Sequence, residues 1–488
     1  MPSMLDFATL GPAIALAITG LIVLLLGLYL TGEKSGWLVV VGLAGVVVSL
    51  ILSLGQWNSS LSGFEGMVVA DSLAAFFTTV ALIVTALTLL LSANFVVREQ
   101  FGAGEYYALV LFTATGMVVL ANATDLIVFI IGLEILSIAL YVLAGFAKSR
   151  ATSLEAAMKY FLLGAFALGF VVYGSALICG ATGTTQFAEI AAAIAGQNAN
   201  TPLLLVGVGL LIVGFGFKLS FVPFHMWTPD VYEGAPSSVT GFMAVGTKAA
   251  VFGGLLRVLT EAFPALSVEW SAVFWALAIV TMLLGNVSAL TQTNVKRMLA
   301  YSSIGQAGYI LVAVASLAYA PQAGRDAVMF YVLAYTFMTI GAFAVVVALS
   351  GAGDQRTNID DLDGLGRRNP LLAAAMAIFM LSLAGIPPTA GFMAKLYVFN
   401  AAVQAGYLDL AVIGVLTSAI ATYYYLRVIV AMYMRGAEGE QPVLPVSVPV
   451  PLIALVAITI LVTIQLGIFP VLPGDMGSSP LALVPGLR

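Results

Sequence analysis

The sequence predicts an all-α polytopic membrane protein, a bundle of about fourteen transmembrane helices. Of its 488 residues, 61% are hydrophobic and only 8% are charged, whereas a soluble domain has about 25% charged residues. Apolar runs of about twenty residues recur along the chain, and each can cross a hydrocarbon core of roughly 30 Å as a helix. Open sheets and exposed irregular backbone are excluded in lipid, because their amide groups would stay unpaired.

The hydropathy of the chain places the expected helices in order. The seventh and the twelfth are interrupted by proline, and the twelfth is long enough to form two half-helices. The expected spans lie near residues 9–31, 36–55, 71–96, 105–121, 125–147, 153–180, 202–225, 237–260, 270–290, 298–319, 326–349, 370–404, 408–434 and 449–472.

Basic residues in the loops predict the orientation, because cytoplasmic loops retain Lys and Arg. Among the even-numbered loops only Arg325 is basic. Both termini are therefore expected on the outer, periplasmic side. The longest polar connection, residues 354–370, is expected to be a solvated cytoplasmic loop or a short surface helix. The basic residues of the odd-numbered loops are Lys34, Arg98, Lys148, Arg150, Lys296, Arg297, Arg356, Arg367, Arg368 and Arg435.

The composition also limits the chemistry of the chain. The net charge of -5 is small and spread over short loops, so no nucleic-acid partner is expected. The single cysteine, Cys179, excludes an internal disulfide and an iron–sulfur site, which needs several thiolates. The single histidine, His225, excludes a haem with two histidine ligands. No cofactor is expected on this chain, and any linked redox chemistry takes place on another chain.

Five ionisable residues lie inside expected spans. They are Glu134, Lys159, Lys218, Lys248 and Lys395. A charge at the bilayer centre costs at least about 2.5 kcal/mol, so such residues normally face a pathway or a partner. Glu134 is expected about 13 Å from the outer end of its span, at 1.5 Å per residue, which is too deep for its carboxylate to reach the surface. A role in a proton path is expected for it, and the alternative is a buried ion pair that only locks helices together.

Prolines place two of these lysines beside breaks in their helices. Pro223 has no amide hydrogen and its ring clashes with the carbonyl of Leu219, so the seventh span is expected to break just after Lys218. The carbonyls freed there are expected to bind water, which a proton relay needs. Lys395 follows Pro388 by seven residues, two helical turns, and is expected on the face above the second break. Discontinuous helices in corresponding parts of two halves indicate a transport site near the midplane.

Lys248 and His225 are expected to extend the site around Lys218. Lys248 follows the short link 231–237 and stands in the middle of its span, so it is expected to face Lys218 across adjacent helices. His225 is a candidate bridge between the two lysines, since a neutral imidazole accepts a proton on one nitrogen and releases one from the other. A purely structural, hydrogen-bonded role is the alternative for this histidine.

Lys159 and two arginines are expected nearer the membrane surface than the other three lysines. Lys159 lies four residues after Glu155, a spacing that favours a helical ion pair, and it stands near a cytoplasmic end where its side chain can snorkel. Both a proton-path role and a surface role stay open for it. Arg257 and Arg427 lie near span ends, where snorkelling is the expected role.

Three segments resemble the antiporter-like membrane subunits of respiratory complex I. They are "FKLSFVPFHMWTPDVYEGAPSSVTGFMAVGTKAAVF" (217–252), "NVKRMLAYSSIGQAGYIL" (294–311) and "GIPPTAGFMAKLYVF" (385–399). Within that family the chain most resembles the N type, called subunit 2 in mitochondria. The L and M types and the cation/proton antiporter subunits usually carry a histidine and a lysine in the eleventh span. Here that span reads "YVLAYTFMTIGAFAVV", with no ionisable group except tyrosine.

The resemblance implies two inverted five-helix repeats within the fourteen helices. Spans four to eight, in residues 101–262, form the first repeat, and spans nine to thirteen, in residues 263–436, form the second. A three-helix segment, residues 1–100, precedes them, and the fourteenth span follows in residues 437–488.

The resemblance also implies proton translocation and assigns its residues. Glu134 and Lys218 would form a switching ion pair, Lys248 a central relay and Lys395 the exit-side lysine. The hydrated line between them would include His225 and, less directly, Lys159 with Glu155.

The same resemblance implies the setting of the chain. Electron transfer from NADH to quinone would take place in partner subunits, which hold the FMN and the iron–sulfur clusters. The expected partners are the neighbouring antiporter-like subunit M, the small subunits K, J and A, and the lipids of a bacterial inner membrane. Two alternatives stay open: a secondary cation/proton antiporter, and a scaffold that conducts no protons.

Overall fold

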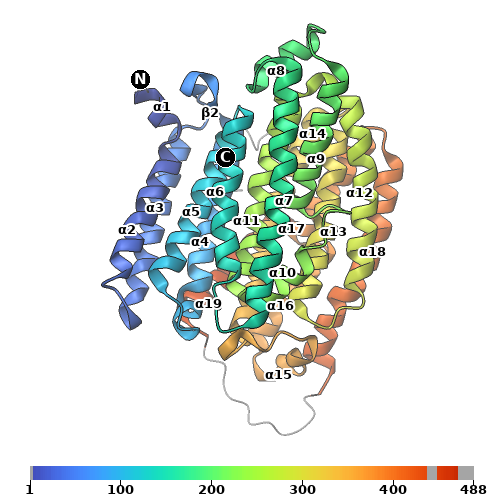
Figure 1. Cartoon of the computed structure of the whole chain (residues 1–488). Helices are drawn as coiled ribbons and strands as arrows, with labels where there is room; N and C mark the ends of the chain where they lie inside the picture. Colours follow the sequence, from blue (N-terminus) through green and yellow to red (C-terminus); the bar gives the residue numbers. More distant parts are fainter. Residues whose placement is uncertain (1–3, 437–447, 471–488) are drawn as a thin grey trace.

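Helices run through almost all of the chain in the computed structural model, which describes residues 4–436 and 448–470 (Figure 1). Most of them are long and lie roughly parallel or antiparallel to one another. Their bounds are α1 Met4–Thr9, α2 Gly11–Gly27, α3 Gly36–Gly55, α4 Ser72–Arg98, α5 Ala103–Asn122, α6 Leu126–Ala144, α7 Ala151–Thr182, α8 Phe187–Ala195, α9 Thr201–Leu219, α10 Thr228–Gly234, α11 Ser237–Arg257, α12 Ser267–Ala289, α13 Val295–Ser316, α14 Pro321–Leu349, α15 Leu365–Arg368, α16 Pro370–Ala384, α17 Ala390–Gln404, α18 Leu408–Met434 and α19 Val450–Ile468.

The predicted fold class is confirmed. In the described residues, 12 helices are long and apolar enough to cross a membrane. The two expected spans outside this group are shorter in the structure. The first is α2, with 17 residues, and the twelfth is divided between α16 and α17, with 15 residues each. Strands are confined to a short antiparallel pair within the described ranges, β1 Leu61–Gly63 and β2 Val68–Ala70.

Both predicted helix breaks are present. The first lies between α9, which ends at Leu219, and α10, which begins at Thr228. The second lies between α16 and α17, where residues 385–389 leave the helix. The first break contains Pro223 and the second contains Pro387 and Pro388, which cannot donate a backbone hydrogen bond.

Polar side chains set where several of these apolar helices begin. Asp71 accepts a hydrogen bond from the amide of Ala74 at the start of α4, and Asp125 does the same for Ile127 at the start of α6. Asn294 caps α13 through the amide of Arg297. Such a cap satisfies a backbone donor that the first helical turn leaves unpaired and stabilises a helix by about 1 kcal/mol.

The two ends of the bundle differ in structure. α1, β2 and α8 lie at one end, and α15 lies at the opposite end (Figure 1). The segment 354–370 contains the 3-10 helix Ile359–Leu362 as well as α15, so the predicted short surface helix is confirmed. Which end faces the cytoplasm stays a prediction, and the C-terminal end of the chain, residues 471–488, lies outside the described residues.

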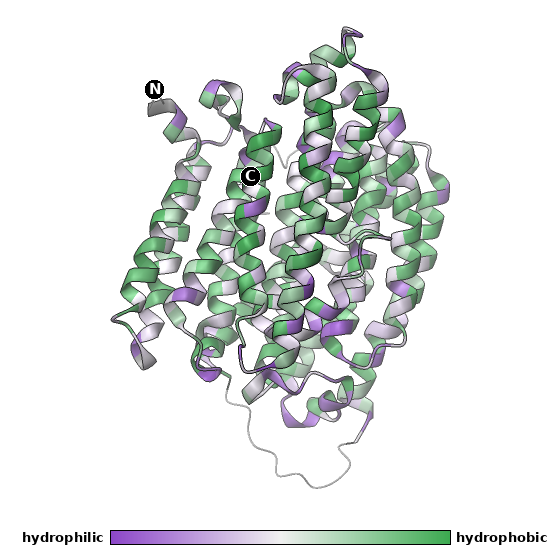
Figure 2. Cartoon of the chain, in the orientation of Figure 1, coloured by the Kyte–Doolittle hydropathy of each residue, from purple (hydrophilic) through white to green (hydrophobic). Residues whose placement is uncertain are grey.

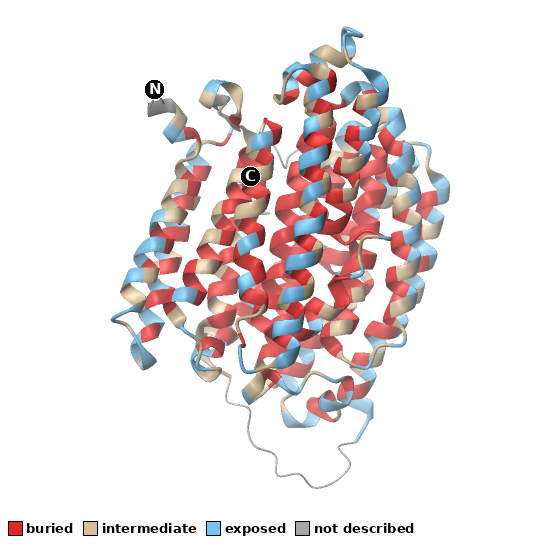
Figure 3. Ribbon diagram, in the orientation of Figure 1, coloured by how far each residue is buried: buried red, intermediate tan, exposed pale blue. Residues whose placement is uncertain are grey.

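Three helices form the buried centre of the bundle. The apolar stretches of α11, α13 and α14 are 100%, 94% and 89% buried, whereas those of α3, α12 and α19 are 39%, 39% and 28% buried. Figure 3 shows the same gradient from a buried interior to exposed outer faces. Those outer faces are mostly hydrophobic (Figure 2), as expected for helices that contact lipid or other membrane chains.

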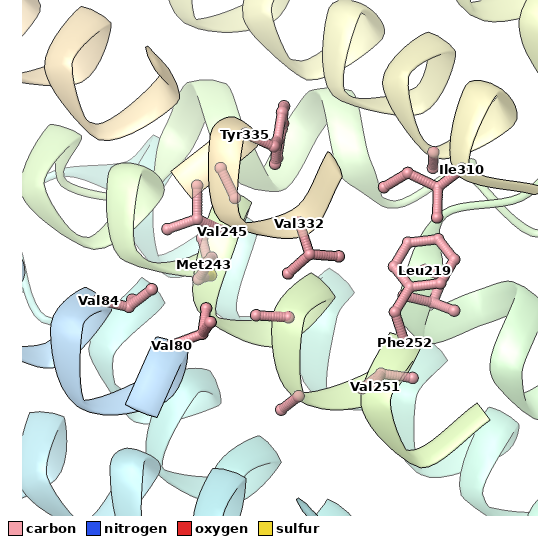
Figure 4. Close-up of a cluster of buried hydrophobic side chains, with 14 of the residues drawn as sticks. Val80, Val84, Leu219, Met243, Val245, Val251, Phe252, Ile310, Val332 and Tyr335 are labelled. Carbon is pink, nitrogen blue, oxygen red and sulfur yellow. The ribbon is translucent and has the colours of Figure 1, made fainter. Parts of the chain in front are cut away.

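Apolar side chains pack tightly along α11. Figure 4 shows Val80 of α4, Val251 and Phe252 of α11, Ile310 of α13 and Val332 of α14 in one cluster. Lys248, in the middle of α11, therefore lies among well-packed apolar side chains.

Arg257 contradicts its sequence-based prediction. It does not reach toward the membrane surface, because the whole residue is only 1% exposed. Its guanidinium donates to Asp71 at 2.7 Å and to Glu261 at 2.7 Å. Two carboxylates at the end of α11 compensate the buried charge. Glu261 lies four residues further along the chain, whereas Asp71 is distant in sequence and could not be assigned to it from spacing alone. Burial raises the pKa of Asp71, but Arg257 outweighs this effect and holds that pKa below its usual value.

Candidate functional site

Lys218 lies in the last turn of α9, just before the first break. It is 3% exposed. Its Nζ donates to Ser137 Oγ at 2.6 Å and to Tyr141 OH at 3.1 Å, both on α6. The same Nζ lies 5.1 Å from the centre of the Tyr141 ring, where a cation is attracted by the π electrons. The ammonium is therefore held by neutral groups.

Glu134 lies on the same face of α6 as these partners. Residues 134, 137 and 141 are three and four positions apart, which aligns them along one side of a helix. Glu134 and Lys218 interact electrostatically, but no ion pair within 4.0 Å joins them in the described structure. The carboxylate oxygen Oε1 of Glu134 is buried and has no hydrogen-bond partner there. The predicted pair is thus close but open in this structure.

Protein groups donate hydrogen bonds to backbone carbonyls at the first break. The carbonyl of Phe217 accepts from the amide of Ser220 and from the indole of Trp227, and the carbonyl of Gly216 accepts from the amide of Phe221. These two carbonyls have protein donors, and the binding of water at the break stays a prediction. Ser220 ends the helix in a left-handed conformation, with φ 64°.

His225 lies within this break and is half-buried. The structure records no hydrogen bond between its ring and Lys218 or Lys248, so the predicted bridge is not formed in this conformation. Its Nδ1 is a buried atom without a hydrogen-bond partner among the described residues.

Lys248 is 2% exposed and stands in the centre of α11. Its Nζ donates to the backbone carbonyl of Ser303 on α13 at 2.5 Å. α9 and α11 pack against one another, as predicted. The two ammonium groups have different partners, however, because Lys218 points to α6 and Lys248 points to α13.

Lys395 contacts the second break. It is 5% exposed, and its Nζ donates to the carbonyls of Ala384 at 2.8 Å and Leu383 at 3.3 Å. These carbonyls end α16, where the helix dipole favours a positive charge. Gly385 follows them with φ 87°, and a Cβ there would lie 2.8 Å from Lys395 Cδ. α17 begins at Ala390, so Lys395 lies in its second turn, and its side chain reaches back to the break.

Lys159 belongs to a different, more exposed cluster. The predicted ion pair with Glu155 is confirmed at 2.7 Å, and a second one joins Lys159 to Asp230 of α10 at 2.6 Å. Arg297 then pairs with Asp230 and Glu233, each at 2.8 Å. The Lys159 side chain is 40% exposed. These residues line a surface cleft of about 440 Å³, so the structure does not place Lys159 and Glu155 with the three buried lysines.

Asp354 is an ionic centre that the sequence did not reveal. Predicted to lie in a solvated loop, it is 6% exposed and accepts from the amide and hydroxyl of Ser237 at 2.8 and 2.7 Å. Lys296, predicted as a loop residue, is 1% exposed and lies 3.4 Å from this carboxylate, while Arg150 lies 3.5 Å from it. Burial raises the pKa of Asp354, but Lys296, Ser237 and Arg150 outweigh this effect and hold the pKa below its usual value.

Lys218, Lys248 and Lys395 share a property that Lys296, also buried, lacks. In the described part of the chain, no carboxylate lies within 4.0 Å of Lys218, Lys248 or Lys395. An ammonium group in a low-dielectric interior without a counter-charge is costly and can release its proton readily. No group of three His, Cys, Asp or Glu side chains that could hold a metal is found among residues 4–436 and 448–470. Ammonium groups buried in this way are candidates for proton exchange.

Comparisons with known proteins agree with this chemistry. Residues 123–421 match the family model described as "NADH:quinone oxidoreductase/Mrp antiporter, TM". The chain is 49% identical to NADH-quinone oxidoreductase subunit N of Trichlorobacter lovleyi, over 91% of each sequence. It is 37% identical to a chain of respiratory complex I from Thermus thermophilus, with a TM-score of 0.79, and the match covers 94% of this chain and 97% of that one.

A more distant likeness concerns the fold alone. A chain of the Mrp complex from Dietzia sp. superposes with a TM-score of 0.80 at 22% identity, covering 99% of this chain and 97% of that one. The family model and the sequence identity to subunit N over nearly the full length show the family of the chain. The chain belongs to the subunit N family of NADH-quinone oxidoreductases, within the NADH:quinone oxidoreductase/Mrp antiporter transmembrane proteins.

Proposed function

We propose that this chain is a proton-translocating membrane subunit of an NADH:quinone oxidoreductase, respiratory complex I. Electron transfer from NADH to quinone in neighbouring subunits drives the movement of protons through it. The observation that carries this proposal is the set of three buried lysines, Lys218, Lys248 and Lys395, none of which has a carboxylate within 4.0 Å among the described residues. The relatives named as subunits of NADH-quinone oxidoreductase supply the assembly in which the protons move.

Each lysine has a role that follows from its surroundings. Lys218 takes up or releases a proton as Glu134 moves toward it or away from it. One unit charge at about 4 Å, with an effective dielectric constant of about 20, is worth roughly 4 kcal/mol, enough to reverse the preference of a proton for one site over another. Lys248 is the central relay, and Lys395 is the exit-side lysine, held at the end of α16.

The remaining candidates have weaker roles. His225 lies beside the first break with an unpartnered nitrogen, and rotation of its ring would bring it into the line between Lys218 and Lys248. Lys159 and Glu155 lie in the surface cleft and would supply protons to that line from the aqueous side.

The larger organisation is also part of the proposal. The chain is divided into a segment of residues 1–100, two inverted repeats of residues 101–262 and 263–436, and a last span in residues 437–488. The broken helices α9 and α16–α17, one in each repeat, support this division. The end that carries α15 faces the cytoplasm of a bacterial cell, and both termini face the periplasm.

The partners follow from the same assignment. Subunit M, the small subunits K, J and A, and lipids surround the exposed apolar faces of the outer helices. NADH, FMN, the iron–sulfur clusters and quinone are held by partner subunits and not by this chain.

Lys218→Ala in the assembled complex tests the proposed function. Proton uptake per NADH oxidised should fall sharply in membrane vesicles while the complex stays assembled, and an unchanged ratio would refute the role of Lys218. Purification of the native protein separates this function from a secondary antiporter. Copurifying flavin and iron–sulfur absorption is expected, whereas sodium exchange by a preparation without these chromophores would favour the antiporter.

A further inference from the structure

A buried polar network on α13 connects the surroundings of Lys248 with those of Lys395. Ser303, whose carbonyl holds Lys248, follows Ser302 in the chain. The hydroxyl of Ser302 lies 2.5 Å from the hydroxyl of Tyr425 on α18. One helical turn further along α13, Gln306 donates from Nε2 to the same tyrosine hydroxyl at 3.1 Å. Ser302, Ser303, Gln306 and Tyr425 are each at most 2% exposed.

Gln306 is held in one orientation by three partners. Its Nε2 also donates to the carbonyl of Leu383 at 3.1 Å, so both amide hydrogens have acceptors. Its Oε1 accepts from the hydroxyl of Tyr331 on α14. An amide oxygen only accepts and an amide nitrogen only donates, so these contacts determine which end of the side chain faces Tyr425 and Leu383.

The carbonyl of Leu383 is shared between this glutamine and the exit-side lysine. Lys395 Nζ donates to it at 3.3 Å, and Gln306 Nε2 donates to it at 3.1 Å. One carbonyl oxygen has two lone pairs and can accept both bonds. A proton gained or lost by Lys395 changes the strength of one of these bonds, and the change reaches Gln306 directly.

Between Lys248 and Lys395, this connection contains no further charged side chain within the described residues. α14 contributes two phenols to it, Tyr331 at Gln306 and Tyr335, which donates to Ser303 Oγ at 2.8 Å. Hydroxyls can accept one proton while they release another, but a neutral amide does not exchange protons at ordinary pH. The amide therefore acts on the geometry of its neighbours and not as a carrier.

We propose that Gln306 is a positioning residue that couples the proton on Lys395 to the hydroxyl pair of Ser302 and Tyr425 beside Lys248. This inference rests on the proposed proton-translocating function of the chain. When Lys395 is charged, it shares Leu383 with Gln306; when it is neutral, Gln306 holds that carbonyl more strongly and reorients relative to Tyr425. The alternative is that the hydrogen bonds of Gln306 only stabilise the packing of α13 against α14, α16 and α18.

The test compares variants of the assembled complex in membrane vesicles, with proton uptake per NADH oxidised as the readout. Gln306→Met keeps the length of the side chain and removes every hydrogen bond, and should lower the ratio by a fold-change comparable to that of Lys395→Ala. Gln306→Glu should restore much of the ratio toward acid pH, where the carboxyl group keeps its proton and can donate, and lose it again toward alkaline pH. If Gln306 only stabilises helix packing, no such pH dependence is expected.

A matched pair of tyrosine variants keeps the inference testable if Gln306→Met does not assemble. Tyr425→Phe removes one oxygen from the network and should lower the ratio. Tyr106→Phe removes an equally buried hydroxyl, bonded to Ser238 at 2.9 Å and outside the network, and should leave the ratio unchanged.

The outcomes separate this inference from the proposed function. If Lys395→Ala lowers the ratio but Gln306→Met and Tyr425→Phe do not, Gln306 has no positioning role and the proposed function stands. An equal loss in Tyr106→Phe and Tyr425→Phe would also overturn the inference. If Lys395→Ala itself leaves the ratio unchanged, both the role of Lys395 and the inference are wrong.

Discussion

Replacing Glu134 with glutamine removes the one carboxylate that acts on Lys218 electrostatically. The two groups lie more than 4.0 Å apart, so their attraction is below about 4 kcal/mol at an effective dielectric constant of about 20, and about 2 kcal/mol at twice that distance. Since about 1.4 kcal/mol is a factor of ten, the ratio of protonated to neutral Lys218 should fall by roughly 30-fold to 1,000-fold. Glutamine keeps the shape of the side chain, and Ser137 and Tyr141 still hold the ammonium.

The assay is NADH-driven proton uptake in vesicles, divided by the NADH oxidised. Glu134→Gln should lower this ratio strongly without loss of assembled complex. Glu269→Gln is the matched control, because Glu269 is exposed on α12 and has no contact with the buried lysines. An unchanged ratio in Glu134→Gln would refute the argument that a moving carboxylate controls the proton on Lys218.

Three further predictions follow from the same contacts. Lys395→Met should lower proton uptake per NADH but leave the thermal stability of the complex unchanged or higher, because an apolar side chain replaces a buried charge without a counter-ion; a destabilised complex would contradict this reading. Gly385→Ala should lower both stability, by about 1–3 kcal/mol for its φ of 87°, and proton uptake, because the new Cβ displaces Lys395; normal uptake would show that the position of Lys395 is not critical. Asp354→Asn should cost about 3–5 kcal/mol by leaving Lys296 buried and unpaired. The folded-state pKa of Asp354 is lowered, so this loss of unfolding free energy should stay constant at neutral and mildly acidic pH and shrink only below about pH 4. Thermal unfolding measures it. A loss that shrinks near pH 6 would point to another group.

The sequence predicted the fold well because the physical signal is strong. An apolar run long enough to cross the membrane is a helix whatever its neighbours are, and a proline ends a helix for local reasons. The breaks after Leu219 and after Ala384 therefore lie close to where they were expected. The lengths of α2 and of the two half-helices depend on turns and packing, which hydropathy does not measure.

The candidate site was predicted less completely. A charged residue inside an apolar span is conspicuous, so Glu134 and the three buried lysines were found. Asp354 was not, since its burial arises from a loop that folds against Ser237 and Lys296, residues far away in the sequence. Side-chain directions also depend on tertiary contacts.

Arg257 and Gln306 illustrate the same limit in different ways. Arg257 lies near a span end, where an exposed arginine is common, and its burial and its pairing with the sequence-distant Asp71 become visible only in the structure. Gln306 is uncharged and was not predicted as a site residue, although the run "YSSIGQAGY" is unusually polar for a membrane helix. A scan for uncharged polar residues in the central spans would have found it.

The most direct test of the central claim is the number of protons taken up per NADH oxidised by the assembled complex with Lys248→Met. Lys248 lies wholly inside the bundle and binds only a backbone carbonyl among the described residues, so methionine removes the charge while nearly preserving the packing. If buried, uncompensated lysines carry the protons, the ratio falls while electron transfer centres and assembly remain intact. A ratio equal to that of the native complex would contradict the account.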